Sequence, residues 1–291
     1  MANLLDIRRR IKSVKNTQQI TKAMKMVSAA KLKRAQNRVV SARPFANKMN
    51  EVLSQLAAQT PEDFHHPLLD ARGDERYLVV LVTADKGLCG AFNTNLLKAA
   101  QAFVKENANK TIEFLTIGRK GRDFFRRRGS IVGEYVGLTG KGRVDFSEAL
   151  EVARDVVNRF TEDEDLDKVF LIFAEFKSVL NQRIVVEQLL PISRTTETSE
   201  ESDTGNSQDY IYEQPPAEIF SRLLPRLVET QIFRALLESI ASEQGARMTA
   251  MDAASKNAGD LISSLTLNLN RVRQAAITRE IIEIVSGASA L

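Results

Sequence analysis

Hydrophobic positions over residues 3–58 recur at alternating intervals of four and three residues. This spacing is typical of one face of a helix that pairs with a second helix. The segment contains no glycine and only one proline, Pro44, so nothing in it opposes a continuous helix strongly. The pattern predicts a long coiled-coil helix whose seam consists of Ile7, Ile11, Val14, Leu32, Ala35, Val39, Ala42, Ala46, Met49, Leu53 and Leu56.

The chemistry of this seam changes in the stretch "ITKAMKMV". The seam positions in and next to this stretch are polar, and they are Gln18, Thr21, Lys25 and Ser28. The apolar side chains stand one residue before the seam, at Ile20, Met24 and Val27. A shift of one residue rotates an apolar stripe by about 100° around a helix. We interpret the rotation as a change of packing partner.

A matching pattern covers residues 217–286, which contain an early Pro225 and only two glycines, Gly245 and Gly259. A helix of this length would extend roughly 100 Å. Neither long helix can bury its stripe alone, so we expect an antiparallel coiled coil with a left-handed twist, although two ordinary helices of a globular bundle remain an alternative. The C-terminal seam consists of Ala258, Ile262, Leu265, Leu269, Val272 and Ala276.

The middle of the chain alternates strand-like and helix-like segments, and it holds ten of the fourteen glycines. This alternation predicts a Rossmann-like α/β domain with a mainly parallel five-stranded sheet, so the fold class is mixed α/β. We expect strands at 77–83, 111–117, 130–136, 168–176 and 183–190, and helices at 93–106, 119–128 and 146–160. The predicted domains are the N-terminal helix 1–58, the α/β domain 68–212 with a mobile acidic loop at 194–214, and the C-terminal helix 216–291.

Charge is distributed unevenly along the chain. The net charge is only +4, yet residues 1–60 hold thirteen basic side chains against the acidic Asp6 and Glu51. This concentration indicates that one region faces an acidic partner. No apolar stretch approaches the roughly 18 residues of a membrane-spanning helix, so no direct span is expected. A single cysteine, Cys89, cannot form an intrachain disulfide and favours a reducing compartment.

The nucleotide-binding patterns that an α/β domain invites do not fit. "TADKGLCGAF", with Gly87 and Gly90, matches neither the dinucleotide fingerprint nor the Walker motif, and "GLTGKGR" has Gly142 where a magnesium-binding Ser or Thr belongs. The two histidines, His65 and His66, are adjacent in a turn-prone segment. The sequence therefore predicts no catalytic, cofactor or metal site.

Two classes of function fit the basic helix. One is nucleic-acid binding, because clustered Lys and Arg release counterions from phosphates, although residues 1–44 contain no aromatic side chain for stacking on bases. The other is a structural coupling element, a rigid rod held by surrounding acidic protein. The second explains the helix length, the pairing and the charge together.

Five sequence stretches carry a resemblance to a known family. "DIRRRIKSVKNTQQITKAMKMVSAAKL", "TADKGLCGAFN", "IGRKGRDFF" and "RMTAMDAASKNAGDLI" with "NRVRQAAITREIIEIVSGASAL" resemble the gamma subunit of the bacterial F-type ATP synthase. The resemblance spans the whole chain. It implies a central rotor stalk that couples proton-driven rotation of the membrane ring to ATP synthesis or hydrolysis by asymmetric contacts, with a basic coiled-coil nucleic-acid-binding or scaffold protein as the alternative.

The resemblance also implies partners and contact residues. The partners would be the alpha and beta subunits, the epsilon subunit and the membrane c-ring, with no nucleic acid, no cofactor and catalysis on beta. The protein would lie peripherally on the cytoplasmic side of the bacterial inner membrane. The segments that contact the ring would be Ile20, Thr21, Lys22, Met24, Arg247, Arg273, Gln274, Ile277 and Thr278, and the turn of the foot domain would be Asp85, Lys86, Gly87, Cys89 and Gly90.

Three positions depart from the family pattern. Gly245 stands where the family usually has alanine, Lys86 replaces the more usual arginine, and Lys256 lies in an altered "AASKNA" stretch. A glycine within a helix lowers helix propensity by about 1 kcal/mol, so Gly245 is expected to soften the C-terminal helix.

Overall fold

The computed structural model describes residues 4–61, 63–193 and 214–289. The chain divides into two compact units, a terminal unit of residues 1–29 and 247–291 and a central unit of residues 30–246. The predicted acidic loop at 194–214 lies, except for residue 214, outside the described residues. The division into domains 1–58, 68–212 and 216–291 stays a prediction.

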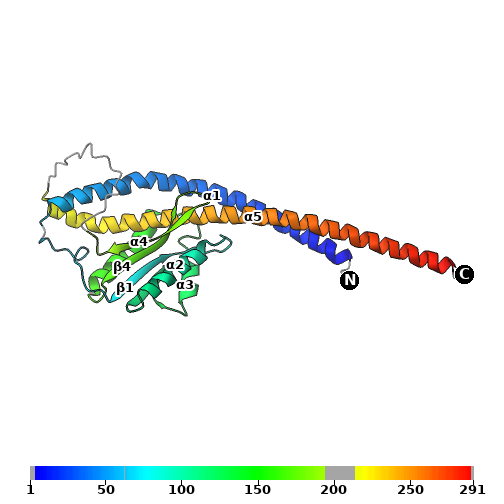
Figure 1. Ribbon diagram of the computed structural model, residues 1–291. Helices are drawn as coiled ribbons and strands as arrows, with labels where there is room; N and C mark the ends of the chain where they lie inside the picture. Colours follow the sequence, from blue (N-terminus) through cyan, green and yellow to red (C-terminus); the bar gives the residue numbers. More distant parts are fainter. Residues whose placement is uncertain (1–3, 62, 194–213, 290–291) are drawn as a thin grey trace. The chain divides into compact units, whose positions relative to one another are not determined.

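Two long helices, α1 (Leu4–Gln59) and α5 (Pro216–Ser289), contribute to both units. They contain 56 and 74 residues and lie within three residues of the bounds expected from the periodicity. Figure 1 shows α1 in blue and α5 in yellow to red. Each helix continues through an internal proline, Pro44 or Pro225. The long terminal helices of the predicted fold are thus confirmed.

The central unit contains a five-stranded sheet in the order β3-β2-β1-β4-β5. Its first four strands pair in parallel and β5 pairs antiparallel with β4, as the mixed α/β prediction requires. The central strand β1 is buried at six of its seven residues, which is typical of a parallel strand covered on both faces. The strands are β1 (Arg76–Val82), β2 (Thr111–Ile117), β3 (Ser130–Tyr135), β4 (Lys168–Phe176) and β5 (Gln182–Leu190).

Three shorter helices, α2 (Phe92–Glu106), α3 (Arg119–Phe125) and α4 (Phe146–Glu162), cross between the parallel strands. The predicted capping box of α4 is present, because the Glu148 carboxylate accepts the Asp145 N–H at 2.9 Å. The expected extension of α3 to residue 128 is wrong. The N–H groups of Arg128 and Gly129 both donate to the Phe125 carbonyl, which closes the helix into a turn.

Candidate functional site

In the terminal unit, α1 and α5 meet along the predicted seam even where the seam becomes polar. The Lys25 Nζ lies 2.6 Å from Asp252 Oδ1, and Gln18 donates to the Ser255 carbonyl at 3.3 Å. Thr21 and Ser28 are buried. As residue numbers fall along α1 they rise along α5 in these contacts, so the two helices are antiparallel here.

The Lys25–Asp252 pair is supported by a second cation. Lys256 Nζ lies 3.5 Å from the other Asp252 oxygen, so the carboxylate faces two ammonium groups. The hydrogen bond from Lys25 is the main cause that lowers the pKa of Asp252 below its usual range. Lys256, one of the positions that depart from the family pattern, therefore belongs to this polar part of the seam.

The apolar side chains of the rotated stripe point away from α5. Ile20 and Val27 are 60% and 56% exposed, and Met24 is half-buried. The seam thus stays on the same side of α1 and becomes polar, while a second, exposed apolar face lies about 100° around the helix from it. Such a face on a charged helix is typical of a surface that meets another protein.

The predicted contact residues on α5 fall into two groups. Arg247 is buried, whereas Arg273, Gln274, Ile277 and Thr278 are exposed on the last part of the helix. Every residue from 277 to 286 is exposed, so this end of α5 presents an open helical surface. The exposed apolar side chains there are Ile277, Ile281, Ile282, Ile284 and Val285.

The helical surface of the terminal unit is basic. Twelve basic and five acidic side chains belong to residues 4–29 and 247–289. The exposed cations of α1 in this unit lie on several sides of the helix, and they are Arg8, Arg9, Arg10, Lys12, Lys15 and Lys22. A surface that combines exposed cations with exposed apolar side chains fits an acidic protein partner that buries it.

In the central unit, the predicted turn after β1 is built around the buried Asp85. Its Oδ1 accepts the backbone N–H groups of Arg119 and Gly137 at 3.1 and 3.0 Å. Its Oδ2 accepts the N–H of Gly140 at 2.7 Å and the Thr139 hydroxyl at 3.0 Å. One carboxylate therefore ties together the segments that follow β1, β2 and β3 at the carboxyl edge of the sheet.

This arrangement explains why the glycine-rich segments do not form a phosphate site. Backbone N–H groups at the carboxyl edge of a parallel sheet are the donors that commonly hold a phosphate. Here the N–H groups of Arg119, Gly137 and Gly140 are aimed at the Asp85 carboxylate. A bound phosphate would have to displace an anion that belongs to the chain itself.

The remaining residues of the turn divide between a buried and an exposed side. Cys89 is buried and accepts a hydrogen bond from Asn93 Nδ2 at 3.1 Å, so it packs as part of the core. Lys86 and Gly90 are exposed and Gly87 is half-buried. The left-handed backbone of Gly90, with φ of 58°, turns the chain into α2.

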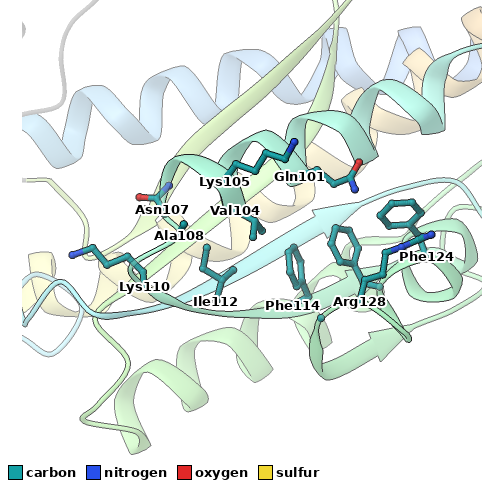
Figure 2. A pocket seen from close by; sticks show the side chains of 12 residues that line it. Gln101, Val104, Lys105, Asn107, Ala108, Lys110, Ile112, Phe114, Phe124 and Arg128 are labelled. Carbon is teal, nitrogen blue, oxygen red and sulfur yellow. The ribbon is translucent and has the colours of Figure 1, made fainter.

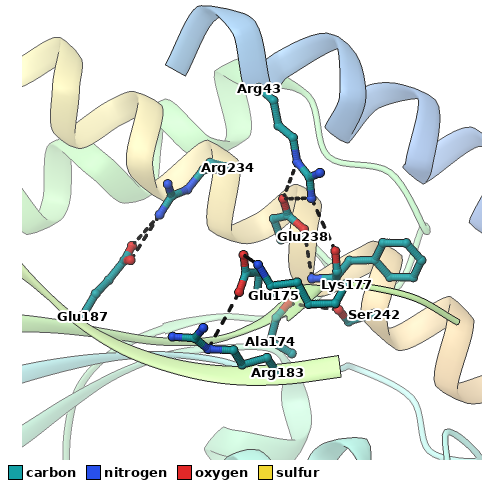
Figure 3. A network of polar contacts seen from close by, with 10 residues as sticks. Arg43, Ala174, Glu175, Lys177, Arg183, Glu187, Arg234, Glu238 and Ser242 are labelled. Carbon is teal, nitrogen blue, oxygen red and sulfur yellow. Dashed lines mark hydrogen bonds and ion pairs between the residues drawn. The ribbon is translucent and has the colours of Figure 1, made fainter. Parts of the chain in front are cut away.

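A second polar network in the central unit was not predicted from the sequence. Figure 3 shows the Arg43 guanidinium of α1 beside the Glu238 carboxylate of α5. Glu238 is only 5% exposed and accepts bonds from Arg43 Nη2 at 3.0 Å and from the backbone N–H of Phe176 at 2.9 Å. A second salt bridge joins Arg234 Nη2 of α5 to Glu187 Oε1 of β5 at 3.0 Å. These bonds fasten both long helices to the end of the sheet.

Ligand chemistry is sparse in the parts of the chain that the structure describes. Those residues contain no cluster of three or more His, Cys, Asp or Glu side chains that could hold a metal ion. Within the same residues, no helix combines the length and the hydropathy that crossing a bilayer requires.

Comparisons with known proteins agree over the whole chain. Residues 3–291 match the family described as ATP synthase. The chain is 51% identical over 294 residues to the ATP synthase gamma chain of Solibacter usitatus, and the match covers 100% of this chain and 99% of that protein. It is 52% identical over 292 residues to the ATP synthase gamma chain of Desulforamulus reducens, with 100% of both chains covered.

Two solved structures are similar in fold. One is a chain of the Tetrahymena thermophila mitochondrial ATP synthase, from a structure of its central stalk and c-ring, with a TM-score of 0.60 and 26% identity over 81% of this chain and 99% of that chain. The other belongs to the Euglena gracilis mitochondrial ATP synthase, with a TM-score of 0.66 over 99% of this chain and 94% of that chain. At 20% identity, the second similarity supports the fold alone.

Proposed function

Because the chain belongs to the family of ATP synthase gamma chains and is a rotor-stalk subunit of an F-type ATP synthase, we propose that its terminal unit is the part that contacts the catalytic ring. The observation that supports this assignment is the second apolar face of α1. Ile20 and Val27, seven residues apart on one side of the helix, are 60% and 56% exposed there. The expected contact residues on the same stretch of helix are Thr21, which is buried in the seam, and Met24, which is half-buried between this face and the seam.

The partners of the proposed assembly follow from the family. The Tetrahymena neighbour comes from a structure of a central stalk with its c-ring, and the Euglena neighbour from one of F1 with a c-ring. We assign to this chain an alpha3beta3 ring around the terminal unit, with the c-ring and the epsilon subunit against the α/β part of the central unit. The turn at Asp85–Gly90 belongs to that foot. The complex places the chain peripherally on the cytoplasmic side of a bacterial inner membrane.

The coupling mechanism uses the asymmetry of a two-helix rod. A pair of helices has no threefold symmetry, so at any moment it presents different side chains to three equivalent catalytic sites. One side presents Ile20 and Val27 of α1, and another presents Arg273 and Ile277 of α5. A contact shifts the equilibrium between the open and closed states of a catalytic site only if it binds one state more tightly than the other. When the rod rotates, each site meets a different face, so the site that is open changes.

The chain itself acts in this mechanism as a non-catalytic part. Each exposed ion pair with an acidic partner contributes at most about 1 kcal/mol, so no single cation dominates the interface. Apolar contacts of exposed side chains such as Ile20 supply a larger share when they are buried. Hydrolysis of ATP belongs to the partner subunits, and steady turnover by the purified chain alone would contradict this assignment.

The direct test replaces the apolar face in the assembled complex. Ile20→Gln with Val27→Gln should lower torque in ATP-driven single-molecule rotation, because two side chains that the ring buries become polar. Val40→Gln is the matched control, since Val40 is a 64% exposed apolar residue of α1 in the central unit. Both variants keep a good helix former at each position. Equal torque from the double variant and the control would contradict the assignment of this face to the ring.

A further inference from the structure

The central unit contains a cavity of about 490 Å³ between α2, β2 and the end of α3, away from the Asp85 turn and from the Arg43–Glu238 network. This volume lies within the range of small-molecule sites in proteins, which is about 300 to 1,000 Å³. Figure 2 shows its lining side chains, which come from α2 on one side and from β2 and α3 on the other.

The floor of the cavity is aromatic and aliphatic. Phe114 and Phe125 stack with ring centroids 4.0 Å apart, and Phe124 meets Phe125 edge-on at 5.1 Å. Ile112 and Val104 are only partly covered by the core on which they pack. The cavity therefore leaves apolar surface open that a ligand with a hydrocarbon or aromatic body would bury favourably.

The lining residues carry charge of one sign only. Lys105, Lys110 and Arg128 belong to the lining, the polar members Gln101 and Asn107 are neutral amides, and no acidic side chain lines the cavity. The ammonium of Lys110 is partly neutralised by Asp74, whose carboxylate lies 2.8 Å away.

The other two cations remain available to a ligand. The Arg128 guanidinium lies 4.5 Å from the centre of the Phe124 ring, which holds it beside the apolar floor. Lys105 is exposed on α2. Within the described part of the chain, no ion pair is formed by either residue.

We propose that this cavity binds an amphiphilic carboxylate, a molecule with an apolar body and one anionic head. The body lies on Val104, Ile112 and Phe124, which are only partly covered, and the head accepts charge-assisted hydrogen bonds from Arg128 and Lys105. A simple inorganic anion does not fit this site, because it would leave the open apolar surface of Val104, Ile112 and Phe124 uncovered. A neutral apolar molecule would leave the two cations unpaired.

The test measures octanoate binding to the full-length chain by isothermal titration calorimetry. Octanoate should bind measurably and raise the thermal unfolding midpoint as its concentration increases. Acetate, which has the head alone, and 1-octanol, which has the apolar body alone, should each bind at least about tenfold more weakly, as expected for the loss of one of the two kinds of contact. Equal affinity of octanoate and either comparison molecule would overturn the proposal.

Matched variants assign the binding to this cavity. Lys105→Gln with Arg128→Gln should weaken octanoate binding about tenfold or more, since both charged donors are lost. Lys98→Gln with Arg127→Gln removes two exposed cations from the same helix and loop without touching the lining, and it should leave the affinity unchanged. An equal effect of both double variants, or none from the first, would overturn the proposal. Unchanged circular dichroism verifies that each variant is folded.

Discussion

Replacing Asp85 by alanine removes the acceptor for three backbone N–H groups and one hydroxyl in a single change. The distances of 2.7 to 3.1 Å identify all four as hydrogen bonds to a charged group. Each such bond contributes about 1.5 to 3 kcal/mol, and water entering the vacated space recovers part of the loss. We therefore expect Asp85→Ala to lower the free energy of unfolding of the α/β part by about 4 kcal/mol or more.

Asparagine at the same position separates charge from shape. Asp85→Asn keeps one oxygen in place for the N–H groups of Arg119 and Gly137, but it turns an N–H toward the N–H of Gly140. We expect the free energy of unfolding to fall by about 2 kcal/mol, because two hydrogen bonds weaken and a third is replaced by two N–H donors that face each other. The order of stability should be wild type, Asp85→Asn, then Asp85→Ala.

The assay is urea unfolding followed by circular dichroism, together with hydrogen exchange of the Gly137 and Gly140 amides. Exchange at these amides should accelerate in both variants, since they lose their acceptor or face a weaker one. Asp123→Ala is the control, because Asp123 is an exposed aspartate of α3 that pairs only with its neighbour Arg122 among the described residues. Little change in Asp85→Ala, or equal losses in Asp85→Ala and Asp85→Asn, would refute the carboxylate as the organiser of this edge.

Two further predictions concern backbone geometry and alkaline pH. Gly118→Ala places a Cβ 2.2 Å from the Thr83 carbonyl oxygen, whereas Gly137→Ala meets nothing within 4 Å, and both positions have positive φ. Backbone strain should therefore lower the free energy of unfolding of Gly137→Ala by only about 1 to 2 kcal/mol, and the close contact should lower that of Gly118→Ala clearly more. Urea unfolding measures both losses, and similar losses would contradict the close approach. Burial raises the pKa of Tyr77 and of Tyr135 to about 12, aided by Asp74 and Asp155 respectively. Because the unfolded tyrosine loses its proton near pH 10, folding stability should fall as pH rises from 10 to 12. Ultraviolet titration should show one fewer tyrosine ionising near pH 12 in Tyr77→Phe than in the wild type.

Regular elements were predictable where local pattern decides them. The bounds of β2 and β4 agree with the sequence prediction residue for residue, because each is a short run rich in β-branched and aromatic residues between polar or turn-forming segments. The four-three spacing likewise gave the seam of α1, whose members Leu32, Val39 and Leu56 are buried. Both signals depend only on residues that are close in the chain.

Contacts between distant segments were not predictable in the same way. The motif around Asp85 suggested a structured turn, but its partners Thr139 and Gly140 lie more than 50 residues later, and no periodicity links them. The buried Glu238 carries no local signal either, since only the fold brings Arg43 and the Phe176 amide to it. The apolar pattern also could not tell whether the polar stretch near Ser28 leaves the seam or stays within it.

The salt bridge between Lys25 and Asp252 fixes the phase of one long helix against the other. Two helices joined by repeating apolar contacts can in principle slide by seven residues and meet equivalent neighbours, and a polar contact at one position of the seam disfavours such a slip. Residues 245 and 259, seven positions from Asp252 in either direction, are both glycines, so a slip would leave the Lys25 ammonium facing a bare backbone. A two-helix shaft transmits torque only while its helices keep their register, and this ion pair favours one register over the slipped ones.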